Sequence, residues 1–435
     1  MTSTSRPHAL ISGAGIGGPA LAYWLHRYGY AVTVVERAPV LRTGGYKVDL
    51  RGVAIEVADR MGVLPEIRRA STDMRTGAYV NDDGRRVATL PADIFGARVD
   101  GDGEIMRGDL TRILHARTRD DVEYVFGDSI SSLTDDGTGV NVTFERGTPR
   151  RFDLVVGADG LHSTVRRLAF GDESRYLRRI GAYIAAFSIP DGLAAPGEEL
   201  YHLTPGRLIC TYSASGEHGA NGAKAWLCFR SPRLDYDPRD ADGQRALLAT
   251  AFEGVGWQVP RLLEASRAAT DFYFDGLDLI EMDRWSRGRV VLLGDAAHCA
   301  SPASGQGTGM ALVGAYVLAG ELAAAGGDPR TGFARYEGEM RPYVTANQRM
   351  AEKFVPQMTP TSRAAIRFRH VMLRMLSHLP WKNYVAKKLA EDVQRCAHAI
   401  TLKPYGTHRP APAPAPALTS AQAGTFCPGG SSLHP

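Results

Sequence analysis

A glycine-rich segment near the N-terminus has the composition of a nucleotide-binding turn. Residues 13–18 read Gly-Ala-Gly-Ile-Gly-Gly, a GxGxxG sequence between a predicted strand and a predicted helix, and Glu36 ends the next predicted strand. Gly13 permits a tight turn, Gly15 lets a pyrophosphate approach the backbone, and Gly18 lets the helix pack closely on the strand. The helix N-terminus adds positive potential, and Glu36 is placed to accept hydrogen bonds from a ribose diol. A purely structural turn is the alternative, but this context favours a dinucleotide.

Two further motifs combine glycine and aspartate directly after a predicted strand. Gly157–Arg166 reads GADGLHSTVR, and Gly294–His298 reads GDAAH, followed by Pro302 and by Gly-Gln-Gly at 305–307. Three turns of this kind in one chain, each at the end of a predicted strand, are hard to explain as structural punctuation alone.

The elements around these motifs predict an α/β fold with a parallel sheet. Strands at His8–Ser12 and Ala31–Glu36 flank a helix at Gly18–Tyr28, and a later buried strand at Val290–Leu293 leads into a helix from about Gly309 to Ala325. These first and last units would form one discontinuous domain. Between them, from about 181 to 274, short strands separated by Gly- and Pro-rich turns predict a mostly antiparallel sheet.

We therefore expect a Rossmann-like domain, an inserted and mostly antiparallel sheet, and a C-terminal helical region. The 435 residues would divide into a first part of the Rossmann-like domain at 1–178, the sheet at 179–275, the second part of the domain at 276–345, helices at 346–407 and a disordered Pro/Ala-rich tail at 408–435. The apolar residues between 368 and 379 have helical spacing, which predicts that one helix face packs and the other is charged.

The charge balance excludes some classes of function. With 51 basic and 47 acidic side chains the net charge is +4, which is too mild to argue for nucleic-acid binding. The basic residues concentrate in 341–405. This segment contains 12 Lys and Arg but only three acidic residues, Glu352, Glu391 and Asp392, so its net charge is +9. A solvated helix face is the simplest interpretation, and an acidic partner or a membrane surface is the alternative.

The cysteines and the apolar segments indicate a cytoplasmic protein without a metal site. Five cysteines are scattered and form no CxxC, so we expect reduced thiols, with no zinc site and no redox dithiol. Glycines break the N-terminal apolar segment, which disfavours an export signal. The uncharged run 300–320 is too rich in Gly, Ser and Thr to predict membrane insertion. A monomer or a homodimer is expected.

The order of the three motifs resembles the FAD-dependent aromatic hydroxylases, the class A flavoprotein monooxygenases. The resemblance covers roughly residues 8–345. It implies one FAD held by all three motifs, an inserted substrate-binding sheet, NAD(P)H as a transient electron donor, O2 and a small aromatic substrate. The chain has no second GxGxxG, and this family likewise lacks a separate NAD(P)H domain. Residues 44–51, Gly-Gly-Tyr-Lys-Val-Asp-Leu-Arg, more distantly resemble the subgroup of tetracycline-degrading and polyketide-tailoring enzymes.

The resemblance implies roles for individual residues. Glu36 would bind the adenosine ribose, Arg107 the phosphates or ribityl chain, and Asp159 both FAD and NAD(P)H. Asp295 would hold the ribityl hydroxyls, and backbone N–H groups of 307–309 would face the pyrimidine carbonyls of the flavin, where the reduced form carries negative charge. The implied cofactor-binding set is Gly13, Gly15, Gly18, Glu36, Arg37, Arg107, Asp159, Asp295, Pro302, Gly307, Thr308 and Gly309.

Two positions depart from the family pattern, and the catalytic base is not identified. The family usually has Asn at Gly309 and Asp at Gly314, so backbone contacts would have to seat the flavin here. The catalytic candidates are His298, Tyr212 and Arg207, although a hydrogen-bonded structural role is the more common one for a histidine such as His298.

The predicted activity is hydroxylation of an aromatic or polycyclic substrate, phenolic, polyketide or antibiotic, through a flavin C4a-hydroperoxide. The alternatives are a Baeyer–Villiger oxygenase, another FAD oxidoreductase, or a non-catalytic FAD-containing binding protein. A flavin halogenase is disfavoured because the chain has no Trp-x-Trp-x-Ile-Pro segment.

Overall fold

The structure, a computed structural model, describes residues 6–42, 44–214, 222–378 and 382–406. Its first sheet is mostly parallel, which confirms the predicted α/β class. The strand order is β19 (Ser286–Arg287), β20 (Val290–Leu292), β11 (Leu154–Gly157), β1 (His8–Ser12), β2 (Ala31–Glu36) and β7 (Glu123–Phe126), with only β19 antiparallel to its neighbour.

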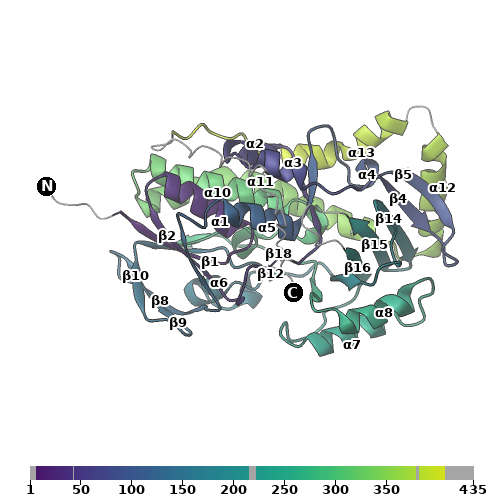
Figure 1. Ribbon diagram of the computed structural model, residues 1–435, viewed down its shortest axis with the longest axis horizontal. Coiled ribbons are helices and arrows are strands. Elements are labelled where there is room, and N and C mark those ends of the chain that lie inside the picture. The colour runs from purple at the N-terminus through teal and green to yellow at the C-terminus, as the bar shows by residue number, and fades with distance from the viewer. Residues whose placement is uncertain (1–5, 43, 215–221, 379–381, 407–435) are drawn as a thin grey trace, which may run out of the picture.

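This sheet is buried because its strands are apolar on both faces. Every residue of β20 and β11 is buried, and the residues of β1 and β2 between their first and last positions are buried as well. Strands covered on both sides read as continuous apolar runs, which matches the sequence. Helices α1 (Gly17–Arg27) and α10 (Gly307–Ala324) pack together on one face, with α11 (Pro329–Met358) beyond them (Figure 1).

The second large sheet has seven strands and is built from two distant segments. Its order is β17 (Tyr273–Gly276), β13 (Ala182–Ile189), β16 (Gly222–Arg230), β15 (Arg207–Ala214), β14 (Glu198–Thr204), β4 (Thr76–Val80) and β5 (Arg86–Pro91). All neighbours are antiparallel except β14 and β4. The sheet is therefore not confined to 179–275, because the β4–β5 hairpin extends it through a parallel pairing between distant strands.

Helices cover the two faces of this sheet differently. Helices α7 (Ala241–Ala251) and α8 (Val259–Ala268) pack on one face, and the other face meets α11, α12 (Arg363–His378) and the loops of the first domain. Figure 1 shows α7 and α8 below the sheet and α12 at the far end of the molecule. The side of the sheet that faces the first domain is called the domain-facing side below.

Shorter elements complete the fold and connect the two sheets. The remaining strands are β3 (Lys47–Leu50) with β6 (Gly103–Met106), β8 (Ile130–Asp135) with β9 (Val140–Phe144) and β10 (Arg150–Phe152), and β12 (Leu177–Arg178) with β18 (Leu279–Ile280). The remaining helices are α2 (Val53–Arg60), α3 (Leu64–Arg69), α4 (Ala92–Phe95), α5 (Arg107–Ala116), α6 (Thr164–Phe170), α9 (Asp295–His298) and α13 (Lys382–Ala397), with short 3-10 turns η1 (Glu173–Arg175) and η2 (Pro302–Ser304).

The C-terminal helices confirm the predicted helical region but begin earlier. Helix α11 starts at Pro329 and continues for 30 residues through Pro342, so the expected boundary at 345/346 falls inside one helix. The expected tail at 408–435 lies outside the described residues. Within the described residues, only α10 is long and apolar enough to cross a membrane, and 72% of it is buried inside the protein.

Candidate functional site

The three motif turns lie side by side at the carboxyl edge of the parallel sheet. They follow β1, β11 and β20, which are neighbours in the strand order. The Gly13 amide donates to the carbonyl of Val35 over 2.7 Å, and the residue has a φ of +105°. A Cβ on Gly13 would lie 2.5 Å from the Ala158 carbonyl oxygen, so the first two motifs touch. The three motif turns thus meet at one edge of the sheet, which is the arrangement that the resemblance implies.

The glycines of the first turn have different surroundings. A Cβ on Gly18 would lie 1.9 Å from the carbonyl oxygen of Gly13, so α1 can approach the strand only with glycine there. The nearest atom to a Cβ on Gly15 is Nη2 of Arg107, at 3.7 Å. Gly18 therefore serves packing, whereas Gly15 presents open backbone beside a guanidinium, which suits a phosphate ligand.

Glu36 lies next to this turn, as the sequence predicts. Its carboxylate accepts hydrogen bonds from the backbone N–H groups of Ala14, at 2.8 Å, and Ala38, at 2.9 Å. Arg37 is exposed beside it. The carboxylate is thus fixed at the end of β2, where a ribose bound at the glycine turn would reach it.

Asp159 is directed into its own turn. Its carboxylate accepts hydrogen bonds from the Ser163 hydroxyl and from the Val165 amide, the latter at 3.1 Å, at the start of α6. Burial raises the pKa of Asp159, and these hydrogen bonds oppose that shift. Through these hydrogen bonds Asp159 orders the turn between β11 and α6.

Asp295 is exposed at the start of α9, shortly after β20. It begins α9 after Gly294, whose φ is +62°, and its side chain is exposed. Burial by surrounding protein nevertheless raises its pKa, and Arg107 opposes the shift. A Cβ on Gly307 would lie 3.7 Å from its Oδ1 atom, so the carboxylate adjoins the start of α10. A side chain that is accessible and yet surrounded by protein is placed to hold a bound ligand.

The N-terminus of α10 offers unpaired backbone donors. The turn η2 leads through Gly305, with a φ of +63°, to Gln306, and the first helical hydrogen bond runs from the Met310 amide to the Gln306 carbonyl over 2.8 Å. The N–H groups of residues 307–309 precede that bond and have no partner within the helix. They suit carbonyl or anionic oxygens.

Both departures from the family pattern lie at closely packed positions. A Cβ on Gly309 would lie 3.2 Å from the Ala54 Cβ of α2, and a Cβ on Gly314 would lie 2.9 Å from Cδ1 of Leu293. A larger side chain at either position would require these neighbours to shift.

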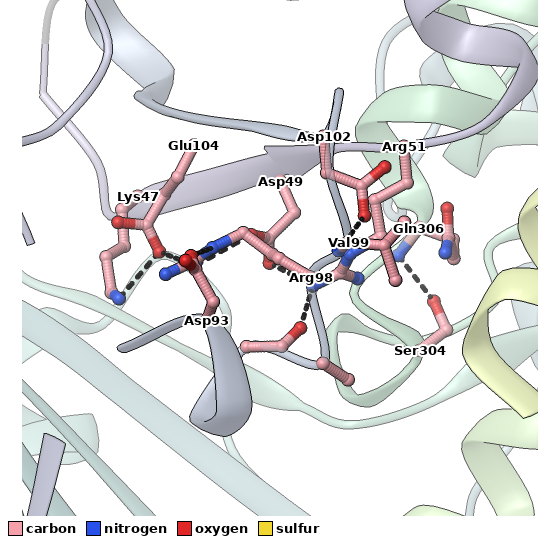
Figure 2. A network of polar contacts seen from close by, with 12 residues as sticks. Lys47, Asp49, Arg51, Asp93, Arg98, Val99, Asp102, Glu104, Ser304 and Gln306 are labelled. Atoms are coloured by element: carbon pink, nitrogen blue, oxygen red, sulfur yellow. Dashed lines mark hydrogen bonds and ion pairs between the residues drawn. The ribbon is translucent and has the colours of Figure 1, made fainter. Parts of the chain in front are cut away.

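Two buried donors near α10 lack partners. The Nε of Arg51 and the Nε2 of Gln306 have no hydrogen-bond acceptor, although the two residues are only 4% and 1% exposed. A Cβ on Gly305 would lie 3.3 Å from Nη1 of Arg51, so both donors adjoin the loop before α10. Figure 2 shows Arg51 and Gln306 at one end of a polar network. Buried donors are rarely left unpaired, so an acceptor-rich group such as a flavin fits here.

The polar network links β3 to β14 of the seven-stranded sheet, and Figure 2 shows the part of it around Lys47, Arg98 and Glu104. The Lys47 ammonium pairs with Glu104 at 2.7 Å and with Glu199 of β14, and Arg98 pairs with Glu104 at 2.6 Å and with Asp49 at 3.2 Å. Burial alone would lower the pKa of Lys47, but Glu199 and Glu104 together raise it. The network fixes the 44–51 segment between the two sheets.

The catalytic candidates on the sheet lie on opposite faces. Tyr212 is on the domain-facing side, fully buried, and its hydroxyl accepts from the Lys47 amide at 3.1 Å. Arg207 lies on the α7 side, where its guanidinium donates to the carbonyls of Ala251 and Pro205. Arg207 is therefore not brought to the motif turns, because side chains alternate between faces along β15.

His298 is also turned away from the motif turns. It is buried, its Nε2 lies 3.4 Å from the Tyr336 hydroxyl of α11, and its ring packs 4.6 Å from that of Trp285. Burial lowers its pKa to about 3, so it is neutral at ordinary pH. These contacts favour the structural role over the catalytic one.

A group of residues that sequence reasoning missed lies near Asp295. Asp275 on β17 accepts hydrogen bonds from the hydroxyls of Tyr236, at 3.0 Å, and Tyr273, at 3.4 Å, and pairs with His162 of the second motif. The Tyr273 ring lies 6.4 Å from that of Tyr46, between centroids. His162 belongs to the GADGLHSTVR segment, but its partner Asp275 lies on the distant strand β17. No local sequence pattern indicates that the two residues pair.

An aromatic surface occupies the domain-facing side of the sheet. The rings of Phe95 and Tyr201 are stacked with centroids 5.1 Å apart, and Tyr79 and Trp226 lie 5.6 and 6.1 Å from Tyr201. All four side chains are half-buried. Tyr201 and Trp226 pack against the same apolar cluster as Ala303 of η2, so this surface adjoins the turn that precedes α10.

The described residues contain no group of three or more His, Cys, Asp or Glu side chains that could hold a metal ion. Four cysteines, Cys210, Cys228, Cys299 and Cys396, are free thiols, and Cys427 lies outside the described part of the chain.

A Rossmann-like sheet with three glycine and aspartate turns at one edge, facing a second sheet, has the arrangement of a dinucleotide-binding protein. Residues 6–175 and 279–351 match the family model described as an FAD binding domain, and the chain belongs to this family. It is an FAD-dependent monooxygenase related to the class A flavoprotein hydroxylases.

Relatives support this assignment over most of the chain. An uncharacterized protein of Mycobacterium tuberculosis is 42% identical over 398 residues, 91% of this chain and 99% of its own length. A flavin-dependent monooxygenase of Legionella longbeachae is 38% identical over 340 residues, 78% and 86% of the two chains. The crystal structure of tetracycline destructase Tet(51) is similar with a TM-score of 0.79 and 36% identity, covering 92% of this chain and 100% of that one.

Proposed function

We propose that this monooxygenase uses NAD(P)H and O2 to hydroxylate an aromatic or polycyclic substrate. The observation that carries the proposal is the half-buried aromatic surface of Tyr79, Phe95, Tyr201 and Trp226, next to the turn before α10. Aromatic side chains recognise a planar ring by stacking and edge contacts. Such a surface beside the flavin would hold an aromatic substrate against it.

We propose that the motif turns hold FAD along the carboxyl edge of the parallel sheet. Glu36 would bind the adenosine ribose, the turn at Gly15 and Arg107 the phosphates, and Asp295 the ribityl chain. Pro302 would shape the turn that leads to the amides of Gly307, Thr308 and Gly309, which would face the flavin ring. Bound FAD supplies the electron transfer from NAD(P)H and the activation of O2.

The protein residues would contribute binding, orientation and electrostatics. The N-terminal amides of α10, together with Arg51 and Gln306, would stabilise negative charge on the reduced ring. The Lys47 network would keep the 44–51 segment closed against the sheet and exclude water from the ring. Tyr212, hydrogen-bonded to the Lys47 amide, would position this segment rather than contact substrate directly.

We infer a polycyclic, phenol-bearing natural product or antibiotic as the substrate class. The support is the similarity to tetracycline destructase Tet(51), which is 36% identical and covers 92% of this chain. A phenol-bearing ring accepts electrophilic oxygen more readily than an unsubstituted one does.

The test is to assay the FAD-loaded protein with NADH and NADPH against simple phenols, naphthols and tetracyclines. We expect one polycyclic compound to stimulate NAD(P)H and O2 consumption and to yield a product heavier by one oxygen atom on a ring carbon. An ester or lactone product would instead identify a Baeyer–Villiger reaction. NAD(P)H oxidation that releases only peroxide with every compound would overturn the proposal. Trp226→Leu should weaken substrate binding, whereas Leu227→Met, on the opposite sheet face, should not.

A further inference from the structure

Helix α12 exposes an apolar stripe. Phe368, Val371, Met372 and Met375 are 68%, 48%, 49% and 57% exposed, and among the described residues the other large apolar side chains classed as exposed are Val40, at 68%, and Tyr273, at 38%. Positions separated by three, four and seven residues lie on one face of a helix. The four side chains therefore form one continuous surface, called the α12 stripe below.

The α12 stripe is not the face by which the helix packs on the protein. Ile366 and Leu376 are buried, each 7% exposed, and α12 packs against β5 of the seven-stranded sheet. The helix thus has one apolar face for folding and a second apolar face that the described residues leave uncovered. An exposed apolar cluster of this kind marks an interaction surface.

The stripe has a basic edge. Arg363 and Arg367 are exposed, and neither forms an ion pair within the described part of the chain. At 100° per residue they lie along one side of the stripe, and α12 contains no Asp or Glu. A helix with exposed Phe, Val and Met beside unpaired arginines has the composition of one that lies in a membrane interface.

The position of α12 suits contact with a flat surface. Figure 1 shows α12 at one end of the molecule, on the side of the seven-stranded sheet away from β1, β2 and the N-terminus. A bilayer at this end would leave the motif turns accessible.

We propose that α12 docks this protein peripherally on an anionic lipid bilayer, with the α12 stripe in the acyl boundary and Arg363 and Arg367 on lipid phosphates. Charge complementarity decides against a second copy of the chain as the occupant. A two-fold contact between two α12 stripes would place arginine edges together with no acid on either helix to pair with them. The inference is independent of the oxygenase reaction.

The experiment measures sedimentation of the full-length, FAD-loaded protein with vesicles. Vesicles of phosphatidylcholine alone are compared with vesicles that also contain phosphatidylglycerol, at low and high salt. We expect binding to the anionic vesicles, at least about fivefold weaker binding to the neutral ones, and weakening by salt, because each surface arginine contributes on the order of fivefold in affinity and salt screens it.

Paired variants separate the apolar and the basic contributions. One double variant combines Phe368→Ser with Met372→Ser, and the other combines Arg363→Glu with Arg367→Glu. Each should weaken binding to anionic vesicles about tenfold or more. Val40→Ser, at a residue that is also 68% exposed, and Arg261→Glu, on the exposed surface of α8, are the matched controls and should bind as the wild type does. Flavin absorbance and melting temperature confirm that each variant is folded.

Three results would overturn the proposal: no binding of the wild type to anionic vesicles, binding that the α12 variants retain in full, or equal loss in the controls. Light scattering after gel filtration adds a fourth. A wild-type dimer that Phe368→Ser converts to a monomer, without vesicle binding, would assign the stripe to a second copy instead.

Discussion

The Nε2 atom of His162 lies 3.2 Å from a carboxylate oxygen of Asp275, although the two residues are 113 positions apart. The other ring nitrogen lies 2.7 Å from Glu173, so the imidazole is held between two carboxylates. The second glycine motif is thereby joined to the edge strand of the seven-stranded sheet, β17.

This pairing predicts a pH dependence of stability. Burial is the largest influence on His162 and lowers its pKa, but Asp275 and Glu173 together raise it to about 10, above the ordinary value of 6.5. The stabilisation is therefore complete below about pH 6.5 and is lost as the pH rises towards 10. We expect His162→Gln to lower the free energy of unfolding by about 1 kcal/mol at pH 6 and by less at pH 10. The loss is modest because the side chain is about a third exposed and solvent screens the ion pairs. Urea unfolding at several pH values measures this, and His398→Gln, at an exposed histidine, should show no such trend.

Asp295→Ala should release FAD. The carboxylate is exposed beside the start of α10, and removing a charged hydrogen-bonding group costs about 2 kcal/mol, or roughly thirtyfold in affinity. Flavin absorbance relative to protein absorbance after gel filtration checks this. Asp283→Ala, at an exposed carboxylate, is the control, and a fully flavin-loaded Asp295→Ala protein would contradict the assigned site.

Gly18→Ala and Gly15→Ala should fail in different ways. A methyl group at Gly18 would overlap the Gly13 carbonyl oxygen, so we expect a loss of about 3 kcal/mol in the free energy of unfolding, or no folded protein. A methyl group at Gly15 meets only Arg107, at 3.7 Å, so that variant should fold and bind FAD less tightly. Thermal melts and flavin titration distinguish the two outcomes, and equal stability of both variants would refute the separate roles.

Restoring the family residue by Gly309→Asn should destabilise the protein. The new side chain would press on Ala54 of α2, from which its Cβ would lie 3.2 Å away, and overpacking of this kind costs about 1–3 kcal/mol. The double variant with Ala54→Gly should recover part of that loss. Unfolding curves for the two single variants and the double variant test the contact, and strict additivity would argue against it.

Lys47→Met should be among the more destabilising substitutions in the chain. The substitution would leave Glu199 and Glu104, whose side chains are 2% and 7% exposed, without the ammonium that pairs with both. We expect this to lower the free energy of unfolding by about 3–5 kcal/mol. Arg86→Met removes a more exposed pair with Glu198 and should cost about 1 kcal/mol or less. Urea unfolding compares the two, and a loss in Lys47→Met no larger than in Arg86→Met would show that the network is dispensable.

The sequence predicts the parallel sheet and its three turns because local patterns encode both. A glycine or aspartate placed directly after an apolar strand signals a turn at the carboxyl edge, and β1, β11 and β20 are neighbours as that logic requires. The pairing of β4 with β14 was not predictable, since it joins segments far apart and depends on tertiary packing.

The sequence also could not show which face of the sheet a given side chain of a strand occupies. The alternation in β15 separates Arg207 from Tyr212, but only the packed structure shows which of the two points to the first domain. The contact of His162 with Asp275 was missed for the same reason, because a distant charge partner leaves no local pattern.

The strand order has a consequence for the assembly of the protein during synthesis. The strand that precedes Asp295, β20, is the last strand of the parallel sheet to leave the ribosome, after the whole β13–β17 segment. If the assigned contacts hold FAD, an emerging chain that ends before α10 can hold only the adenosine end of it. Cofactor loading would then follow the folding of the intervening sheet, and a free pool of FAD would act on nearly complete chains.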